Sequence, residues 1–116
     1  MPMPIPAELK ETVDAALASY CQHNVPAHIR DQAKLTHRWR GSKVTLVEQR
    51  RHWLDPTIWG ESPVAQFRYN PDAKDWRLFW RDDRERWHRY EDHPGARNIS
   101  RLLVEVDQDP VGLFWG

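Results

Sequence analysis

Several features that would assign the chain to a class are missing or scarce in its 116 residues, a length that suits one domain. Cys21 is the only cysteine, so no disulfide can form within the chain, which fits a reducing compartment. No apolar run approaches the roughly 20 residues that span a bilayer, and the first residues do not resemble a secretory signal. We therefore expect a cytoplasmic protein that contacts no membrane.

The chain also lacks net charge, which argues against a histone-like binder of polyanions. The charges are nevertheless unevenly distributed. Residues 1–29 carry one basic and three acidic groups, residues 30–101 carry sixteen basic and eleven acidic groups, and residues 102–116 carry three acidic groups only. Thirteen of the 17 basic residues are Arg, which stacks on rings and binds phosphates in a fork, and the chain has seven Trp. The basic middle is therefore where anion binding is expected.

Motifs for common chemistry are absent as well. There is no Gly-rich phosphate loop, no Gly-x-Ser-x-Gly elbow and no His-Glu-x-x-His. Cys21, His23 and His28 have zinc-like spacing, but a structural zinc site needs four ligands. We expect no metal and no cofactor, and we interpret Cys21 as a small buried hydrophobic residue.

Hydrophobic periodicity predicts one α+β domain: a curved antiparallel sheet of about five strands with an N-terminal and a C-terminal helix. Apolar residues recur at helical spacing near both ends, and the period changes to two between them. The predicted segments are an extended lead-in (1–6), a helical region (7–33), the antiparallel sheet (34–92), a helix (97–109) and a packed tail (110–116). The predicted strands are 35–40, 43–50, 63–69, 76–81 and 86–90.

Two hairpin turns decide which residues share a face of this sheet. Gly41-Ser42 predicts a two-residue type II′ turn, which pairs Leu35 with Glu48. A four-residue turn at Asp82–Glu85 would pair Arg81 with Arg86. With that register, one face is apolar, and the expected core is Trp39, Leu46, Phe67, Leu78, Trp80, Trp87, Leu103 and Phe114.

The other face of the second hairpin suggests a function. It would carry Arg77, Phe79, Arg81, Arg86, His88 and Tyr90, with arginines to hold phosphates and aromatic rings to stack on bases. The plainer alternative is a solvated surface whose arginines are balanced by the acidic turn. Our first hypothesis is a non-catalytic module that binds nucleic acid or another polyanion through this face.

Two further hypotheses rest on other residues. The loop 51–62 contains Trp53 and Trp59, and it predicts either a protein–protein contact or a lid over the core. Glu48 falls on the apolar face and therefore needs protonation or a basic partner, for which Arg68 and Arg89 are the candidates. That carboxylate, together with His37, is the alternative of a small enzyme. An exposed outer strand could also pair with a second copy, so the oligomeric state is left open.

A set of motifs resembles one family. The segments VTLVEQR, VAQFRYN, WRLFWRD, RWHRY and VDQDPVGLFWG, taken in order, are similar to domain-of-unknown-function family 3024 over roughly residues 25–116. Gln66 stands where the family's pattern leads us to expect a Lys. The resemblance implies a small stand-alone bacterial protein and no particular activity.

Overall fold

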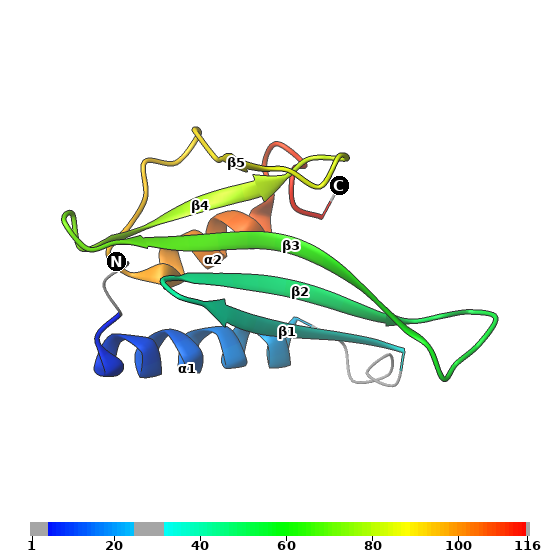
Figure 1. The fold of residues 1–116 in the computed structure, drawn as a ribbon. Coiled ribbons are helices and arrows are strands. Elements are labelled where there is room, and N and C mark those ends of the chain that lie inside the picture. The colour runs from blue at the N-terminus through cyan, green and yellow to red at the C-terminus, as the bar shows by residue number, and fades with distance from the viewer. Residues whose placement is uncertain (1–4, 25–31, 116) are drawn as a thin grey trace.

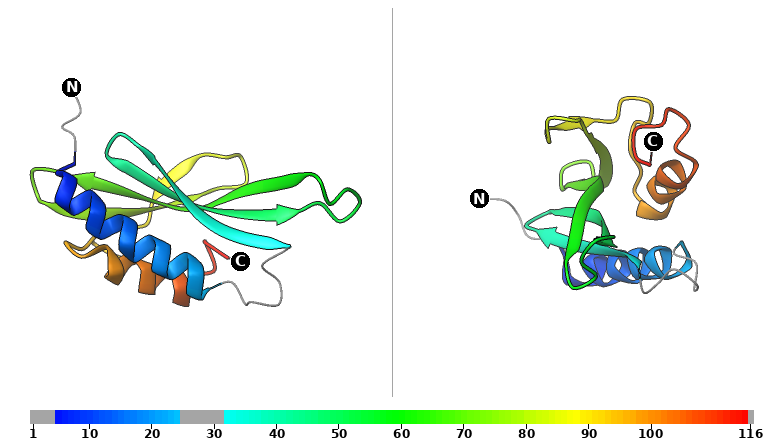
Figure 2. Two further views of the ribbon diagram at one scale, coloured as in Figure 1. Left: turned by 90° about the horizontal axis from the view of Figure 1, so that it is seen from below. Right: turned by 90° about the vertical axis from the view of Figure 1, so that its right-hand side faces the viewer.

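The computed structural model describes residues 5–24 and 32–115, and it places one sheet against two helices. The elements in chain order are α1 (Ala7–His23), β1 (Ala33–Arg40), β2 (Lys43–Arg51), β3 (Trp59–Asn70), β4 (Asp75–Arg81), β5 (Trp87–Arg89) and α2 (Ile99–Gln108). The strands form one antiparallel sheet in the order β1-β2-β3-β4-β5. Both helices lie on the same side of this sheet, which curves around them (Figures 1 and 2). The predicted α+β fold is confirmed.

The helix boundaries follow local signals. Pro6 precedes the first turn of α1, where its missing N–H costs nothing. Asn98 caps α2 by accepting a hydrogen bond from the Ser100 N–H at 2.9 Å. The predicted helical region 7–33 was too long, because α1 ends at His23 and Ala33 already belongs to β1. The stretch 25–31 of that prediction lies outside the described residues. Within the described ranges, no helix is both long and apolar enough to cross a membrane.

The core lies between the helices and the sheet face that they cover, here called the inner face. Trp76, Leu78 and Phe67 from the strands are buried there together with Leu17 of α1 and Leu102 of α2. Of the expected core, Leu46, Phe67, Leu78, Leu103 and Phe114 are buried, whereas Trp39 and Trp80 are partly buried. The prediction that Trp87 belongs to the core was wrong, because the hairpin turn before it is one residue shorter than predicted.

The first hairpin has the predicted register. Arg40 pairs with Lys43 across Gly41-Ser42, and Leu35 pairs with Glu48. Gly41 has a φ of 60°, and the positive φ at this position is what a type II′ turn requires of its first central residue. The turn therefore sets the facing of all residues in β1 and of the adjoining half of β2.

The second hairpin has a register one residue away from the predicted one. The Asp82 N–H donates a hydrogen bond to the Arg86 C=O at 2.8 Å, so the turn between them contains only three residues. The last of these, Glu85, has a left-handed φ of 66°. Three-residue turns of this kind end in a left-handed residue, a role that Gly usually takes. The Asp82 carboxylate stabilises the turn by accepting hydrogen bonds from two of its N–H groups. Arg81 therefore faces Trp87, and not Arg86 as predicted.

That shift moves every residue of β5 to the other face. Trp80 now faces His88, and the two rings stack with centroids 4.7 Å apart on the inner side. Trp87 and Arg89 point to the side opposite the helices, because their partners there are Arg81 and Phe79. A one-residue difference in hairpin register thus exchanges the side chains that face the core with those that face the other side of the sheet.

The C-terminal tail, as far as Trp115, packs on the body. The Asp109 carboxylate accepts hydrogen bonds from the Phe114 and Trp115 N–H groups and folds the tail back. Phe114 is buried against Tyr90, with ring centroids 5.2 Å apart.

Candidate functional site

The sheet face opposite the helices, here called the outer face, is not covered by any helix of the described chain (Figure 2). Residues that face each other across neighbouring strands share a face of the sheet, so the register identifies its members. The basic and aromatic members are Lys34, Arg38, Arg40, Lys43, Arg51, Trp59, Arg68, Arg77, Phe79, Arg81, Trp87 and Arg89. This face is therefore rich in cations although the whole chain is neutral.

Four of these cations form one row across the sheet. Arg40 faces Lys43, Lys43 faces Arg68, and Arg68 faces Arg77. Because neighbouring strands lie about 4.8 Å apart, the row spans about 14 Å. Like charges that directly oppose each other across strands destabilise a sheet unless something offsets them. This row, named the cationic row below, is therefore an arrangement that folding alone does not favour.

The charges in the row are only partly neutralised. Arg77 lies 3.6 Å from the Asp75 carboxylate. Arg40, Lys43 and Arg68 form no ion pair with a carboxylate of the described residues. Partial burial lowers the pKa of Arg68 from its ordinary value, because burial disfavours the charged form, yet Arg remains cationic near neutrality. An anion that binds to this row would supply the missing counter-charges.

Aromatic rings lie beside the row on the same face. The Arg68 guanidinium sits 3.8 Å from the centre of the Phe79 ring, and its Nε donates to Gln66 at 2.7 Å. Gln66 in turn donates to Thr45 at 3.0 Å. The hydrogen bond and the ring together hold Arg68 in one orientation, which lowers the entropy cost of using it to bind a ligand. Gln66 stands where the family's pattern suggests a Lys. It is not a cation itself, but it positions the cation Arg68.

The six residues predicted to bind a polyanion do not all share this face. Arg77, Phe79 and Arg81 lie on it as predicted. Arg86 closes the turn opposite Asp82, and His88 lies on the inner side against Trp80. Tyr90 is buried with 1% of its surface exposed, and its hydroxyl donates to Glu105 at 2.8 Å. Burial first, and then that bond, raise the pKa of Tyr90 to about 12. Tyr90 therefore cannot stack on a base.

The arginines of the second hairpin are also less free than predicted. Arg81 pairs with Glu85 at 3.2 Å, and Arg86 lies 3.7 Å from Asp82. His88 contacts the same Asp82 carboxylate at 2.6 Å, and this hydrogen bond is the main reason that the pKa of Asp82 falls to about 2. The acidic turn thus balances its own arginines, which is the plainer of the two interpretations offered for this hairpin.

Sequence reasoning missed Arg40, Lys43, Arg68 and Arg89. The signal for the first pair was available, because the Gly41-Ser42 turn already places both side chains opposite the apolar residues of their strands. Arg68 was considered only as a partner for Glu48. Arg89 was assigned to the apolar face by the mistaken turn.

The predicted loop 51–62 is shorter in the structure, because Arg51 belongs to β2 and Trp59 begins β3. The remaining residues 52–58 form the tip of an arm that extends beyond the helices (Figure 1). Trp53 is 84% exposed, and Trp59 lies between the ammonium of Lys34 at 4.7 Å and the guanidinium of Arg51 at 5.1 Å. The tip is therefore not a lid over the core.

Glu48 and His37 are not brought together. The Glu48 carboxylate pairs with Arg50 Nε at 2.8 Å and retains 24% side-chain exposure, so the predicted partners Arg68 and Arg89 were wrong. The reason is that Glu48 lies on the inner face, whereas Arg68 and Arg89 lie on the outer face. His37 Nε2 instead contacts Asp14 of α1 at 2.9 Å.

His37 has a structural role in that contact. The same Asp14 oxygen accepts a hydrogen bond from Trp39 Nε1 at 2.6 Å, so one carboxylate joins α1 to β1. These two bonds, with that of Trp39 the stronger influence, lower the pKa of Asp14. Cys21 and His37 line the same cavity, but no hydrogen bond joins them, and burial raises the pKa of the Cys21 thiol to about 11. A protonated thiol is a poor nucleophile, so the cavity does not present Cys21 as an activated cysteine. No group of three metal-ligating side chains occurs among the described residues.

Glu48→Ala is a direct test of the corrected environment. We expect the free energy of unfolding to change by less than about 1 kcal/mol, because an ion pair with an exposed partner contributes little. Urea denaturation measures this change. A decrease of about 3 kcal/mol or more would instead indicate the buried pair that the sequence suggested.

The fold and its bare face define a small α+β protein with one open antiparallel sheet, helices on one side and a cationic surface on the other. Sequence comparison places the chain in a family: it belongs to the DUF3024 family, described as a domain of unknown function, whose family model matches residues 5–116. The resemblance seen in the strand and tail motifs is thereby confirmed. No curated protein and no solved structure matches this sequence.

Proposed function

We propose that this protein is a non-catalytic binding module whose outer face holds single-stranded nucleic acid. The observation that carries the proposal is the cationic row Arg40–Lys43–Arg68–Arg77, which crosses four strands on the side without helices. A row of like charges costs stability in the free protein, and phosphates supply the opposite charge. Glu61 and Asp75 share the outer face and pair with Arg38 and Arg77, whereas the acidic residues of α2, Glu105 and Asp107, lie on the other side of the sheet.

The aromatic members of the outer face favour nucleic acid over other polyanions. Phe79 faces Arg89, and Trp87 faces Arg81, so each ring stands beside a cation. Stacking of one base on an aromatic ring contributes about 1–3 kcal/mol and needs a base that is not already stacked within a duplex. Binding of a single strand combines cations, which contact the phosphates of the nucleic-acid backbone, with aromatic rings, which stack on the bases.

Fluorescence anisotropy of labelled oligonucleotides tests the proposal. If four phosphates are neutralised, affinity for a single strand should fall roughly 50-fold between about 50 and 200 mM salt. A duplex of the same sequence and dextran sulfate, a polyanion without bases, should bind more weakly. Equal binding of the single strand, the duplex and dextran sulfate would indicate general polyanion binding. No binding of the single strand at about 50 mM salt would contradict the proposal.

A protein partner at the tip of the arm is the second candidate, and one observation favours it. Trp53, Leu54 and Ile58 are 84%, 68% and 53% exposed. The loop is nevertheless ordered: His52 Nδ1 accepts hydrogen bonds from the Leu54 and Asp55 N–H groups at 3.1 and 3.3 Å. An ordered loop that presents apolar side chains to water is typical of an interaction site.

A photo-crosslinking amino acid placed at Trp53 would test this second candidate in cells. We expect it to capture a discrete protein, whereas the same group at Ala73, which is exposed in the β3–β4 turn, should capture none. The physical reason is that exposed Trp anchors contribute strongly to interfaces once they are desolvated. Identical products from both positions would contradict the prediction.

A further inference from the structure

The outer edge of β1 offers unpaired backbone groups. β1 is a terminal strand of the sheet. The Gln32 C=O accepts from the Arg51 N–H at 2.8 Å, and in an antiparallel pair such bonded positions alternate with unbonded ones. The N–H and C=O groups of Ala33, Leu35, His37 and Trp39 therefore point away from β2. Within the described part of the chain, no backbone hydrogen bond reaches these four positions from outside the sheet. Such an edge is a template for one further strand.

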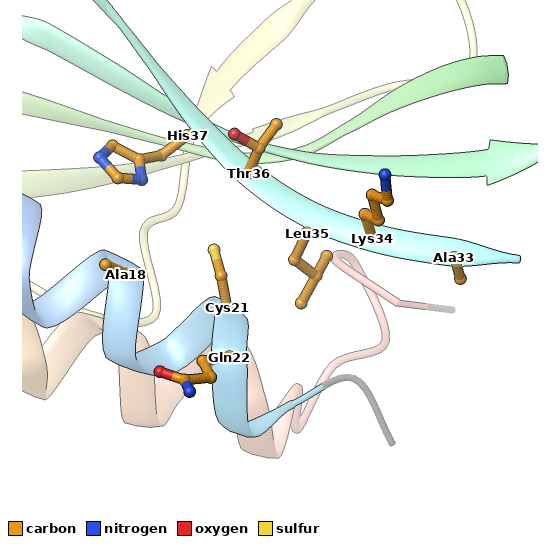
Figure 3. Close-up of a pocket in the computed structure, with 8 residues that line it drawn as sticks. All are labelled: Ala18, Cys21, Gln22, Ala33, Lys34, Leu35, Thr36 and His37. Atoms are coloured by element: carbon orange, nitrogen blue, oxygen red, sulfur yellow. The ribbon is translucent and has the colours of Figure 1, made fainter. Parts of the chain in front are cut away.

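A groove runs beside this edge. It lies between β1 and α1, has a volume of about 460 Å³, and is lined by Ala18, Cys21, Gln22, Ala33, Lys34, Leu35, Thr36 and His37 (Figure 3). Leu35 and Cys21 point into the space between strand and helix, while Lys34 and Thr36 point to the other side of β1. A strand added to the edge would alternate in the same way, so every second side chain would enter an environment of apolar and small residues.

The other side of β1 sets the charge of the added strand. Its four residues there are Lys34, Thr36, Arg38 and Arg40, and β1 contains no acidic residue. Opposite charges on neighbouring strands stabilise a sheet and like charges destabilise it. Arg38 is already paired with Glu61 of β3, so a second copy of the chain would bring Lys34 and Arg40 to the same side as cations without a carboxylate partner among the described residues, which disfavours β1–β1 pairing. An acidic strand would instead extend the cationic row at Arg40 with the opposite sign.

We propose that the β1 edge binds an extended segment of a partner protein as a sixth strand, with acidic side chains beside Lys34 and Arg40 and small apolar side chains in the α1–β1 groove. The backbone of β1 provides the hydrogen bonds, the groove selects the side chains on one face, and the cations select those on the other. This inference does not depend on nucleic-acid binding, because the strand edge and the groove carry it, and Arg40 is the one residue that it shares with the cationic row.

The probe is a fluorescein-labelled peptide, Glu-Val-Glu-Val-Glu-Ala-Glu, and its binding is followed by anisotropy. In a strand, only every second peptide N–H faces β1. Methylation of the backbone nitrogens of one parity should therefore lower affinity at least tenfold, whereas methylation of the other parity should leave it within about twofold. A peptide with Lys in place of Glu should not bind. Equal effects of the two methylation patterns, equal binding of the Lys peptide, or no binding of the parent peptide at about 1 mM would overturn the proposal.

A protein variant gives an independent test. Leu35→Pro removes one outward N–H but no β1–β2 bond, because Leu35 and Glu48 form an unbonded pair, and proline is tolerated at such edge positions. We expect peptide affinity to fall at least tenfold while Leu35→Val, which keeps the N–H, stays within about threefold. Thermal unfolding, which is measured in parallel, reports that the variant is folded and should give a melting temperature close to that of the wild type. Sedimentation that shows a wild-type dimer abolished by Leu35→Pro would assign the edge to a second copy and overturn the proposal.

Discussion

Replacing Arg40 and Lys43 by Gln in one double variant should weaken binding of a single-stranded oligonucleotide at least about tenfold at low salt, or about 1.4 kcal/mol. Both side chains are exposed, face each other across the first turn and belong to the cationic row. Each phosphate that the variant no longer neutralises should make the slope of log affinity against log salt shallower by about 0.7, so the slope should change by about 1.4 for two phosphates.

The matched control removes the same charge from the other side of the molecule. Arg97 and Arg101 are exposed at the start of α2, and their double replacement by Gln should leave both affinity and slope nearly unchanged. Thermal unfolding separates binding from folding. The Arg40/Lys43 variant should melt at the same temperature as the wild type or higher, because it relieves a like-charge pair. If both doubles weaken binding equally, long-range attraction alone is at work and the cationic row has no special role.

Trp76→Ala should have the largest effect on stability, lowering the free energy of unfolding by about 3–5 kcal/mol. Trp76 has no exposed surface, and its ring contacts Trp39 and Tyr69 with centroids 6.0 and 5.0 Å away. Its backbone also bonds to Ala96, in both directions, at 2.7 and 2.9 Å. Removing the ring leaves a cavity between the sheet and both helices, which the surrounding atoms fill only in part.

Trp53→Ala is the control for that substitution, because the residue type is the same and 84% of its surface is exposed. We expect its free energy of unfolding to stay within about 0.5 kcal/mol of the wild-type value. Guanidinium denaturation of both variants gives the comparison. Equal decreases would mean that the tip of the arm contributes to the core, which its exposure contradicts.

The two hairpins show why one face assignment could be predicted and the other could not. Gly41-Ser42 has a residue that readily adopts positive φ, so the turn length and register follow from local chemistry. In the second turn the left-handed residue is Glu85, for which such a conformation is unusual. Its cost is met by the hydrogen bonds of the Asp82 carboxylate, which become visible only in three dimensions. Half of the predicted polyanion site was misplaced through that single residue.

The prediction that Glu48 is buried in the core was wrong for a different reason, which concerns β2 and β3. The register shifts between Leu46 and Val47, where Val64 is the extra residue on β3, and all three are buried. Toward the turn that joins them, β2 and β3 continue past the ends of the helices (Figure 1). Glu48 is on the side predicted for it, yet it is not in the core, because alternation along a strand says nothing about whether anything covers the face.

The α+β class, the order of the elements, the first hairpin and five of the eight side chains expected in the core followed from the sequence alone, since these depend on periodicity, capping and turn residues that act locally. Only the tertiary structure decided which cations stand together. Arg40 and Arg77 are far apart in the chain, and they belong to one row because three successive strand pairings place them there. Sheet registers add from strand to strand, so a one-residue difference at any turn changes every facing beyond it.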